Sequence, residues 1–287
     1  MNETRPQIQL SSNGYKLSSD ATRLGRLEPS DPGWSQARLT EQYRAQGYLW
    51  LKGLLNREAV LNFRHWYFDQ FKATGLLALD SNPREGIYAG SSPGQNEAAI
   101  HQVMVGIVRQ PVYEAFCHSE PLVRFYEAFL QGPVYLHRRK LIRYTLPNDP
   151  HCTGAHYDMV YLREGTDQFC SSWLPLGDIP VEMGGLTYLE GSHELGQELE
   201  RQAKSKGKAG WLGEDLPGLA EQFDRRWLVA DYEAGDVLVH SPYIIHASTV
   251  NHNPAGYLRL STDIRYQRLS DPIDPRWANH WSPDDNL

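Results

Sequence analysis

The segment Tyr257-Leu258-Arg259-Leu260-Ser261-Thr262-Asp263-Ile264-Arg265-Tyr266 alternates apolar and polar side chains. A period of two is typical of a β-strand whose two faces meet different surroundings. One face carries Leu258, Leu260, Thr262, Ile264 and Tyr266, and the other carries Arg259, Ser261, Asp263 and Arg265. Polar side chains that face the interior of a small barrel indicate a function. An arginine such as Arg259 that binds a dicarboxylate through two parallel hydrogen bonds would explain this face. A surface ladder of salt bridges is the alternative that the periodicity leaves open.

Further short strands, separated by turn residues, fill the C-terminal half of the chain. Gly, Pro, Asn and Asp punctuate them, which is typical of a β-sandwich or barrel. The sequence therefore predicts a mainly β fold with flanking helices. The predicted strands are Val134–Tyr144, Ala155–Leu162, Phe169–Leu174, Gly185–Leu189, Asp236–Val239 and Leu258–Tyr266.

The N-terminal half predicts helices around one strand. A short helix from Leu39 to Gly47 precedes the strand Tyr48–Leu51, and Asn56 can cap the next helix. That helix carries the apolar stripe Val60, Phe63, Tyr67 and Phe71, and helical segments follow near 110–131.

The chain is expected to form one domain, 37–287, after an extended N-terminal arm, 1–36, that takes no part in chemistry. Two long polar stretches, 76–100 and 195–231, interrupt the predicted scaffold. Long connections in a compact domain are usually functional, so both are expected to act as lids, and the second is expected to be a helical insert.

Composition narrows the class of protein. The 287 residues are 40% apolar and 22% charged, with a net charge of −7, which gives no basic footprint for nucleic acid. No apolar run approaches the length of a membrane span, and the polar start lacks the core of a signal peptide. Three cysteines without CxxC spacing favour a reducing compartment, so we expect a cytoplasmic protein without nucleic-acid or membrane partners. Oligomeric state cannot be predicted from these features.

His156 and Asp158 lie two apart in a predicted strand and would project from the same face. An imidazole and a carboxylate side by side form two arms of a facial triad, which leaves other metal positions open. The third ligand should be a distant histidine, and His246, after a turn and strand, is the candidate. A His-x-Asp pair by itself is a weak signal, because such pairs arise by chance and more often serve as surface or hydrogen-bonded residues.

In this order, the motifs resemble the phytanoyl-CoA dioxygenase-like branch of the iron(II)/2-oxoglutarate oxygenases. The likeness extends from about Leu39 to Tyr266. The resemblance implies a double-stranded β-helix, a jelly-roll or cupin-like barrel with helices packed on one side. The motifs that carry it are Tyr43–Gly53, His156-Tyr157-Asp158, Trp173–Asp178, Gly184–His193 and His246-Ala247-Ser248, followed by Arg259.

The resemblance also implies roles for individual residues. Iron would bind to His156, Asp158 and His246. The distal carboxylate of 2-oxoglutarate would bind to Arg259 with help from Ser248. Trp173 matches a residue that lines the co-substrate pocket.

Arg139 and Arg143 lie four apart on the predicted strand and would face one side. Relatives place polar residues near the other end of 2-oxoglutarate here, although structural salt bridges are an equal alternative. His193 is expected to fix a loop through a hydrogen bond, and His151 to lie exposed in a loop. His240 is a further histidine near the predicted ligands.

The activity implied by the resemblance is hydroxylation of an unactivated C–H bond in a small-molecule metabolite, using Fe(II), 2-oxoglutarate and O₂ and releasing succinate and CO₂. Natural product biosynthesis is one setting for such enzymes. Asp158 disfavours halogenation, for which relatives carry a small residue at that position. A metal-binding cupin-like protein and a redox-neutral metal-dependent isomerase or hydrolase are the alternatives.

Overall fold

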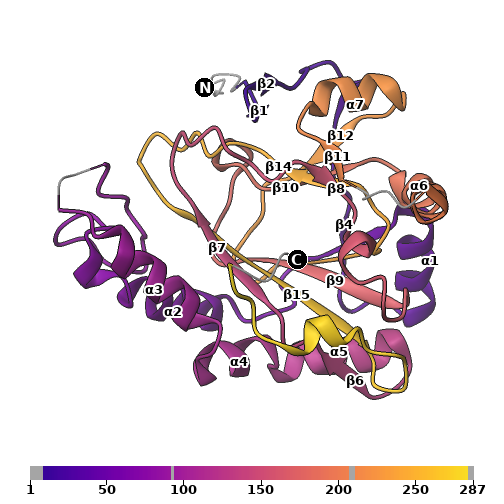
Figure 1. The fold of residues 1–287 in the computed structure, drawn as a ribbon, viewed down its shortest axis with the longest axis horizontal. Coiled ribbons are helices and arrows are strands. Elements are labelled where there is room, and N and C mark those ends of the chain that lie inside the picture. The colour runs from indigo at the N-terminus through magenta and orange to yellow at the C-terminus, as the bar shows by residue number, and fades with distance from the viewer. Residues whose placement is uncertain (1–8, 92–93, 207–210, 284–287) are drawn as a thin grey trace.

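The computed structural model describes residues 9–91, 94–206 and 211–283. Two sheets face each other and form an open barrel, with helices on the outside (Figure 1). The structure therefore has the mainly β architecture with flanking helices that the sequence predicts.

The larger sheet, called here the major sheet, holds the alternating strand between β9 and the edge strands β6 and β7. Its strands run in the order β4-β5-β13-β9-β15-β6, and β7 also pairs with β15. The alternation predicted for β15 is confirmed, because Leu258, Leu260, Ile264 and Tyr266 join the hydrophobic core while Arg259 and Arg265 line an internal pocket. These strands are β4 (Pro29–Ser30), β5 (Tyr48–Leu51), β6 (Val134–Leu136), β7 (Leu141–Thr145), β9 (Phe169–Pro175), β13 (Val237–His240) and β15 (Arg259–Arg268).

The smaller sheet, called here the minor sheet, closes the other side of the barrel. Its order is β11-β8-β14-β10-β12-β3, with antiparallel pairing except between β12 and β3. The strands are β3 (Leu24–Arg26), β8 (Ala155–His156), β10 (Leu186–Leu189), β11 (Trp211–Gly213), β12 (Trp227–Val229) and β14 (His246–Ser248).

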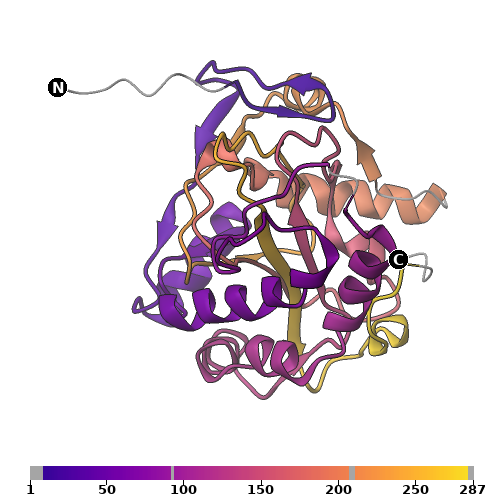
Figure 2. The same cartoon turned by 90° about the vertical axis from the view of Figure 1, so that its left-hand side faces the viewer.

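Helices cover the outer face of the major sheet, as the two views at right angles show (Figures 1 and 2). They are α1 (Gln36–Gln46), α2 (Arg57–Asp69), α3 (Glu97–Ile107), α4 (Pro111–Cys117) and α5 (Glu120–Leu130). The Asn56 side chain caps α2 by accepting a hydrogen bond from the Ala59 amide, as predicted.

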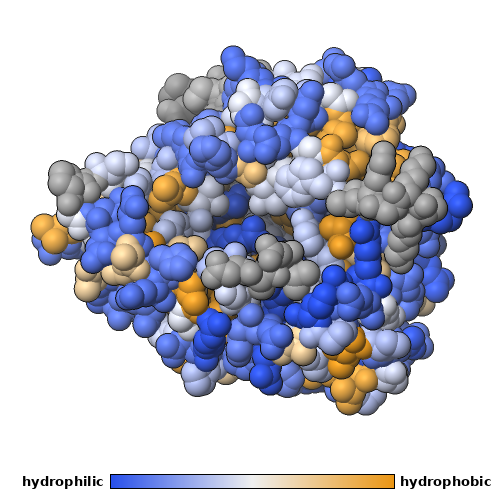
Figure 3. Space-filling model, viewed as in Figure 1, coloured by the Kyte–Doolittle hydropathy of each residue, from blue (hydrophilic) through white to orange (hydrophobic). Residues whose placement is uncertain are grey.

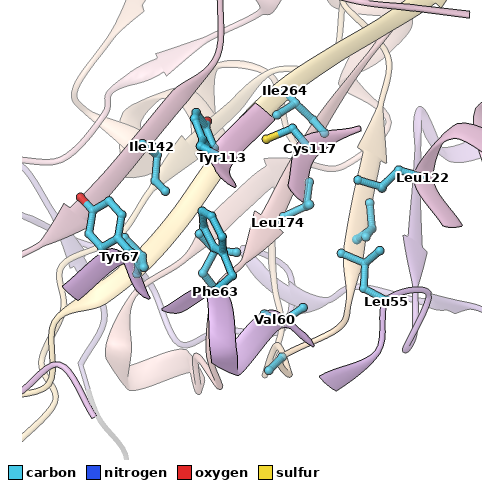
Figure 4. Close-up of a cluster of buried hydrophobic side chains, with 14 of the residues drawn as sticks. Leu55, Val60, Phe63, Tyr67, Tyr113, Cys117, Leu122, Ile142, Leu174 and Ile264 are labelled. Carbon is cyan, nitrogen blue, oxygen red and sulfur yellow. The ribbon is translucent and has the colours of Figure 1, made fainter. Parts of the chain in front are cut away.

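The predicted apolar stripe of α2 forms part of the core between helices and sheet. Phe63 and Tyr67 point from the helix toward residues of the strands and of α4, including Tyr113 and Ile264 (Figure 4). Phe63 also stacks on Phe116 with ring centroids 4.1 Å apart. The core thus fixes the outer face of β15, which holds the polar face of that strand toward the barrel interior.

The predicted strand Val134–Tyr144 is wrong in its middle, because residues 137–140 leave the sheet. The ammonium of Lys140 is buried and lies 2.6 Å from the carboxylate of Glu114. It donates to the carbonyl groups of His137 and Arg138, which turns the chain around the ammonium. The segment is therefore two strands, β6 and β7, separated by a turn.

The predicted strand Ala155–Leu162 is also shorter than expected. It ends at His156, and Asp158–Tyr161 forms the 3₁₀ helix η2. The Met159 amide donates to the carbonyl of Pro242, at 2.8 Å, instead of to a neighbouring strand of the ladder. Asp158 therefore reaches the barrel interior from a helical turn and not from the strand face.

The 195–231 stretch is not a simple helical insert. It contains most of α6 (Ser192–Lys206), then β11, α7 (Leu216–Gln222) and β12, so it supplies two strands of the minor sheet. Residues 207–210 of this stretch, and 92–93 of the other expected lid, lie outside the described residues.

Within the expected N-terminal arm, residues 9–36 run along both sheets. β3 pairs in parallel with β12 of the minor sheet and β4 with β5 of the major sheet. A short hairpin of β1 (Ser11–Ser12) and β2 (Tyr15–Lys16) precedes them, and residues 1–8 lie outside the described part. The described helices include none that is both long and apolar enough to cross a membrane.

Candidate metal and co-substrate site

A pocket of about 670 Å³ lies inside the barrel, between the two sheets. In the space-filling view, the surface is hollowed near the middle of the face, with hydrophilic residues around the hollow (Figure 3). The 3₁₀ helix η2 supplies Asp158 to the lining. The strands β7, β8, β9, β14 and β15 supply Arg143, His156, Trp173, His246, Ser248, Arg259, Ser261, Asp263 and Arg265.

His156, Asp158 and His246 converge at the pocket wall. His156 on β8 and His246 on β14 are register partners in the minor sheet, so their rings lie 4.3 Å apart. Each Nε2 lies 3.8 Å from Oδ1 of Asp158. One ligand atom from each of the three residues lies within 4.8 Å of the others, and all three residues are buried. The structure thus brings together the three metal ligands proposed from the sequence.

Backbone carbonyl groups fix the orientation of both imidazoles. Nδ1 of His156 lies 2.9 Å from the Gly154 carbonyl, and Nδ1 of His246 lies 3.0 Å from the Ile244 carbonyl. Since a carbonyl only accepts, each Nδ1 carries the proton and each Nε2 presents its lone pair to the shared space. Burial is the main cause that lowers the pKa of His156 to about 3 and that of His246 to about 4, so both are neutral near pH 7.

The two oxygens of Asp158 meet different surroundings. Oδ2 accepts a hydrogen bond of 2.9 Å from Arg265 Nη2 and another from the Ser171 hydroxyl, and His240 Nε2 lies 3.6 Å away. Burial alone would raise the pKa of Asp158, but the Arg265 guanidinium and His240 hold it well below its usual range. Oδ1 is buried and has no hydrogen-bond partner among the described residues.

A buried carboxylate oxygen without a partner is costly, and here it faces two imidazole lone pairs. A cation at their meeting point would satisfy all three atoms. Two nitrogens and one carboxylate oxygen form the donor set of a facial triad, which suits Fe(II) and leaves positions for other ligands. The residues therefore fit the metal expected from the sequence.

Arg259 occupies the same pocket and is buried on β15. Its Nε and Nη1 have no hydrogen-bond partner among the described residues, and burial lowers its pKa to about 10. A buried guanidinium with unused donors is a ready partner for a carboxylate. Ser248 and Trp173 line the pocket as well, and the Ser248 hydroxyl accepts a hydrogen bond from the Thr153 amide.

Arg139 and Arg143 do not share one strand face, since residue 139 lies in the turn before β7. Both nevertheless line the pocket. Arg139 is buried, and its guanidinium carbon lies 5.4 Å from the centroid of the Trp277 ring. Arg143 is exposed and is the register partner of Ser261 on β15.

The other histidines have roles outside the ligand set. Nε2 of His193, in the first turn of α6, donates to the Arg44 carbonyl, which agrees with the predicted loop-fixing bond. His151 is exposed and bonds to Asp149. Nδ1 of His240 lies 2.9 Å from the Tyr188 hydroxyl, and its Nε2 faces the carboxylate of Asp158.

Sequence reasoning missed the residues that hold the ligands. Arg265 and Ser171 bond to Asp158, and neither was assigned to the site. The signal was available only for Arg265, which shares the polar face of β15 with Arg259. Tyr157 lies between His156 and Asp158 in the chain. Its side chain points away from the pocket, and its hydroxyl donates a hydrogen bond of 3.0 Å to Glu200 of α6. Of the two expected lids, the described part of 76–100 contributes no residue to the pocket lining, and that of 195–231 contributes Trp211.

Comparison with known proteins gives consistent matches. The family model described as phytanoyl-CoA dioxygenase (PhyH) matches residues 43–259. A protein named 1-deoxypentalenic acid 11-beta-hydroxylase from Streptomyces exfoliatus is 27% identical over 241 residues, which cover 79% of this chain and 80% of that protein. The same named protein from Streptomyces arenae is also 27% identical, over 236 residues.

Solved structures with this fold are more distant in sequence. The epimerase SnoN, in complex with Fe³⁺, alpha ketoglutarate and nogalamycin RO, is 19% identical with a TM-score of 0.57, over 84% of this chain and 86% of that one. EctD from S. alaskensis, with 2-oxoglutarate and 5-hydroxyectoine, is 18% identical with a TM-score of 0.57, over 94% and 87%. The likeness supports the jelly-roll fold.

Proposed function

Because the chain belongs to the phytanoyl-CoA dioxygenase family, we propose that it uses Fe(II), 2-oxoglutarate and O₂ to hydroxylate a C–H bond of a small-molecule metabolite. Succinate and CO₂ are the co-products. The observation that carries this proposal is the buried cluster of His156, Asp158 and His246, with an unpartnered Asp158 Oδ1, in the pocket that also holds the unpartnered donors of Arg259.

His156, Asp158 and His246 would hold the iron, which supplies the redox chemistry with O₂ and 2-oxoglutarate when bound. The chain's own residues prepare the site. Carbonyl groups hold both imidazoles with Nε2 directed inward, and Arg265 with Ser171 keeps Asp158 ionised and correctly turned. Arg259 would bind the distal carboxylate of 2-oxoglutarate, with Ser248 and Trp173 beside it. Arg139 and Arg143 also line the pocket, and Arg139 packs on the ring of Trp277.

Succinate release tests this proposal. The purified protein is incubated with Fe(II), 2-oxoglutarate and O₂ over a metabolite library, and the products are weighed by mass spectrometry. Substrate-dependent succinate together with a product heavier by one oxygen atom supports a hydroxylase. A redox-neutral isomerase or hydrolase, or a cupin-like binding protein, would release no succinate.

We propose hydroxylation of the substrate carbon because both of these relatives from Streptomyces are named hydroxylases. A structural relative is named an epimerase, so a product of unchanged mass formed with succinate release would shift the assignment to that outcome. We also place the protein in a reducing compartment such as the cytoplasm, because Cys117, Cys152 and Cys170 are all free thiols.

Glu200 is expected to help position the metal ligands from the side that faces away from the pocket. It is 2% exposed on α6, accepts the Tyr157 hydroxyl and binds Arg163 Nε at 2.8 Å. Since Tyr157 lies between two ligands, Glu200→Gln should weaken Fe(II) binding, by less than the roughly tenfold that loss of a direct partner of a ligand costs. Glu198→Gln is the matched control, because Glu198 bonds at the exposed surface of the same helix. Equal Fe(II) affinity of the two variants in a metal titration would refute the role.

Buried neutral histidines predict a loss of stability in acid for the metal-free protein. Burial lowers the pKa of His137 to about 4, with comparable effects on His156 and His246, against 6.5 when unfolded. The unfolded chain binds these protons first, so stability present above pH 6.5 is lost as pH falls toward 4. At pH 5 each of these histidines should lower the unfolding free energy by about 2 kcal/mol relative to its value above pH 6.5.

Urea unfolding at several pH values measures this loss. His137→Gln should reduce the slope of unfolding free energy against pH, because it removes one buried neutral histidine. Identical slopes for wild type and His137→Gln would contradict the prediction.

We further propose that the part of 195–231 that carries Trp211 closes over bound substrate. Trp211 lines the pocket and stacks on the His156 ring at 5.6 Å, yet its side chain remains 48% exposed. Proteolytic cleavage within 195–231 should be slower when iron, 2-oxoglutarate and substrate are bound. Equal cleavage rates with and without them would exclude closure.

A further inference from the structure

The pocket contains more guanidinium groups than the iron and 2-oxoglutarate require. Four arginines line it: Arg139, Arg143, Arg259 and Arg265. Three aspartates oppose them: Asp149, Asp158 and Asp263. Four guanidinium groups thus face three carboxylates, which is an excess of one positive charge. The two charges of Fe(II) and the two of 2-oxoglutarate cancel, which leaves the positive excess in place.

Three of the four arginines are already accounted for. Arg265 is paired with Asp158, and its guanidinium carbon lies 4.5 Å from the centroid of Trp277. Arg139 also packs on the ring of Trp277, in the buried turn before β7. Arg259 is assigned to 2-oxoglutarate. Arg143 is the remaining one.

Arg143 forms no hydrogen bond or ion pair with a described residue, although its side chain lies in the pocket wall. It lines the same pocket as His156, Tyr161 and Arg259, so it shares this cavity with the metal ligands and the 2-oxoglutarate arginine. The neighbouring carboxylate of Asp263 is not within ion-pair distance of it. Arg143 is also exposed, so it meets a molecule that enters from solvent.

Part of this pocket wall is aromatic or aliphatic, although Thr145, Thr153 and Asp263 also line it. Tyr161 and Trp211 flank the metal ligands, and Leu141, Leu146 and Met104 extend the wall on the side of β7. Such a surface suits a hydrocarbon or aromatic skeleton with one charged end.

We propose that Arg143 is the substrate-binding residue that anchors the carboxylate of an apolar or aromatic carboxylic acid, and so holds its C–H bond toward the metal. This inference rests on the proposed function of the same site. It assigns Arg143 to the substrate and not to 2-oxoglutarate. A planar fork that faces solvent binds a carboxylate through two parallel hydrogen bonds, which a neutral amide cannot reproduce.

Binding is tested on anaerobic protein loaded with Fe(II) and 2-oxoglutarate, so that no turnover occurs. The probes are monocarboxylic acids with aliphatic, terpenoid and aromatic skeletons, each beside its primary amide and its phosphomonoester counterpart. Calorimetry should show that at least one acid binds about tenfold or more tightly than its amide. Arg143→Gln should remove that difference, and Arg143→Lys should restore part of it.

Arg138→Gln is the matched control. Arg138 is exposed, lies in the same segment and is absent from the pocket lining, so it loses the same charge without losing the contact. It should keep the preference for the acid. The affinity for 2-oxoglutarate should be unchanged in both variants.

Four results would overturn the inference: no acid-specific binding across the panel, a preference for the phosphomonoesters, an equal loss in Arg138→Gln, or a loss of 2-oxoglutarate affinity in Arg143→Gln. Failure of the proposed function looks different. In that case no compound stimulates succinate release in air, while the acid preference in anaerobic binding and its dependence on Arg143 can persist.

Discussion

Replacing His156 or His246 by alanine is expected to abolish tight Fe(II) binding and substrate-dependent succinate release while leaving the barrel folded. Each imidazole presents Nε2 to the carboxylate Oδ1 of Asp158 at 3.8 Å, so each variant loses one of three protein ligands. Loss of an outer-shell partner alone costs about 10- to 100-fold in metal affinity, so loss of a ligand should cost at least about 100-fold.

Metal titration with an iron assay of the gel-filtered protein measures this effect, and circular dichroism checks the fold. His151→Ala is the control, because His151 also lines the pocket but bonds to Asp149 at its exposed edge. It should bind iron like the wild type. Unchanged iron content and turnover in His156→Ala or His246→Ala would remove that residue from the ligand set.

Arg259→Ala is expected to raise the apparent KM for 2-oxoglutarate by at least about tenfold, with little change in Fe(II) binding. Truncating one partner of a buried, hydrogen-bonded charge pair costs about 2–5 kcal/mol, and about 1.4 kcal/mol corresponds to tenfold. Arg259 is buried with unused Nε and Nη1 donors, which is the setting in which that cost applies. Arg259→Lys should recover only part of the loss, since an ammonium is a point charge.

Arg265 is unsuitable as a control for this experiment. Arg265 lies on the same face of β15, but its Nη2 donates to Asp158 at 2.9 Å. Arg265→Ala should therefore weaken Fe(II) binding instead of acting as a neutral variant. Arg143→Gln is the better control for the co-substrate, because it removes a pocket guanidinium that we assign to the substrate. If Arg265→Ala raises the KM for 2-oxoglutarate at unchanged iron affinity and Arg259→Ala does not, the anchor is Arg265.

The alternating strand could be predicted because its apolar residues face the core and its polar residues face the pocket, so the sequence itself shows both environments. Leu258 and Ile264 meet the helical layer and Arg259 meets the pocket, so each side chain records its own surroundings. The ligand set was also found from sequence, since His156 and Asp158 are close in the chain and the family motif adds His246. These signals are local or are carried by a motif.

Tertiary contacts decided the features that the sequence did not reveal. Residues 137–140 read as strand, but the buried ammonium of Lys140 draws the carbonyl groups of its own turn and Glu114 of α4. Asp158 was predicted to lie in a strand, but it begins a helical turn in which Met159 bonds to Pro242 and the Asp158 carboxylate accepts from Arg265. The bond from Met159 to Pro242 spans 83 positions of the chain and that from Asp158 to Arg265 spans 107, and periodicity carries no information about such partners.

The central claim is that the pocket is one site for Fe(II) and 2-oxoglutarate, and anaerobic calorimetry of 2-oxoglutarate with the Fe(II)-loaded protein tests it most directly. We expect one 2-oxoglutarate to bind per chain, to bind much more weakly when Fe(II) is removed, and to lose at least about tenfold in affinity in Arg259→Ala. Absence of binding, or binding of equal strength with and without iron and in Arg259→Ala, would contradict the account.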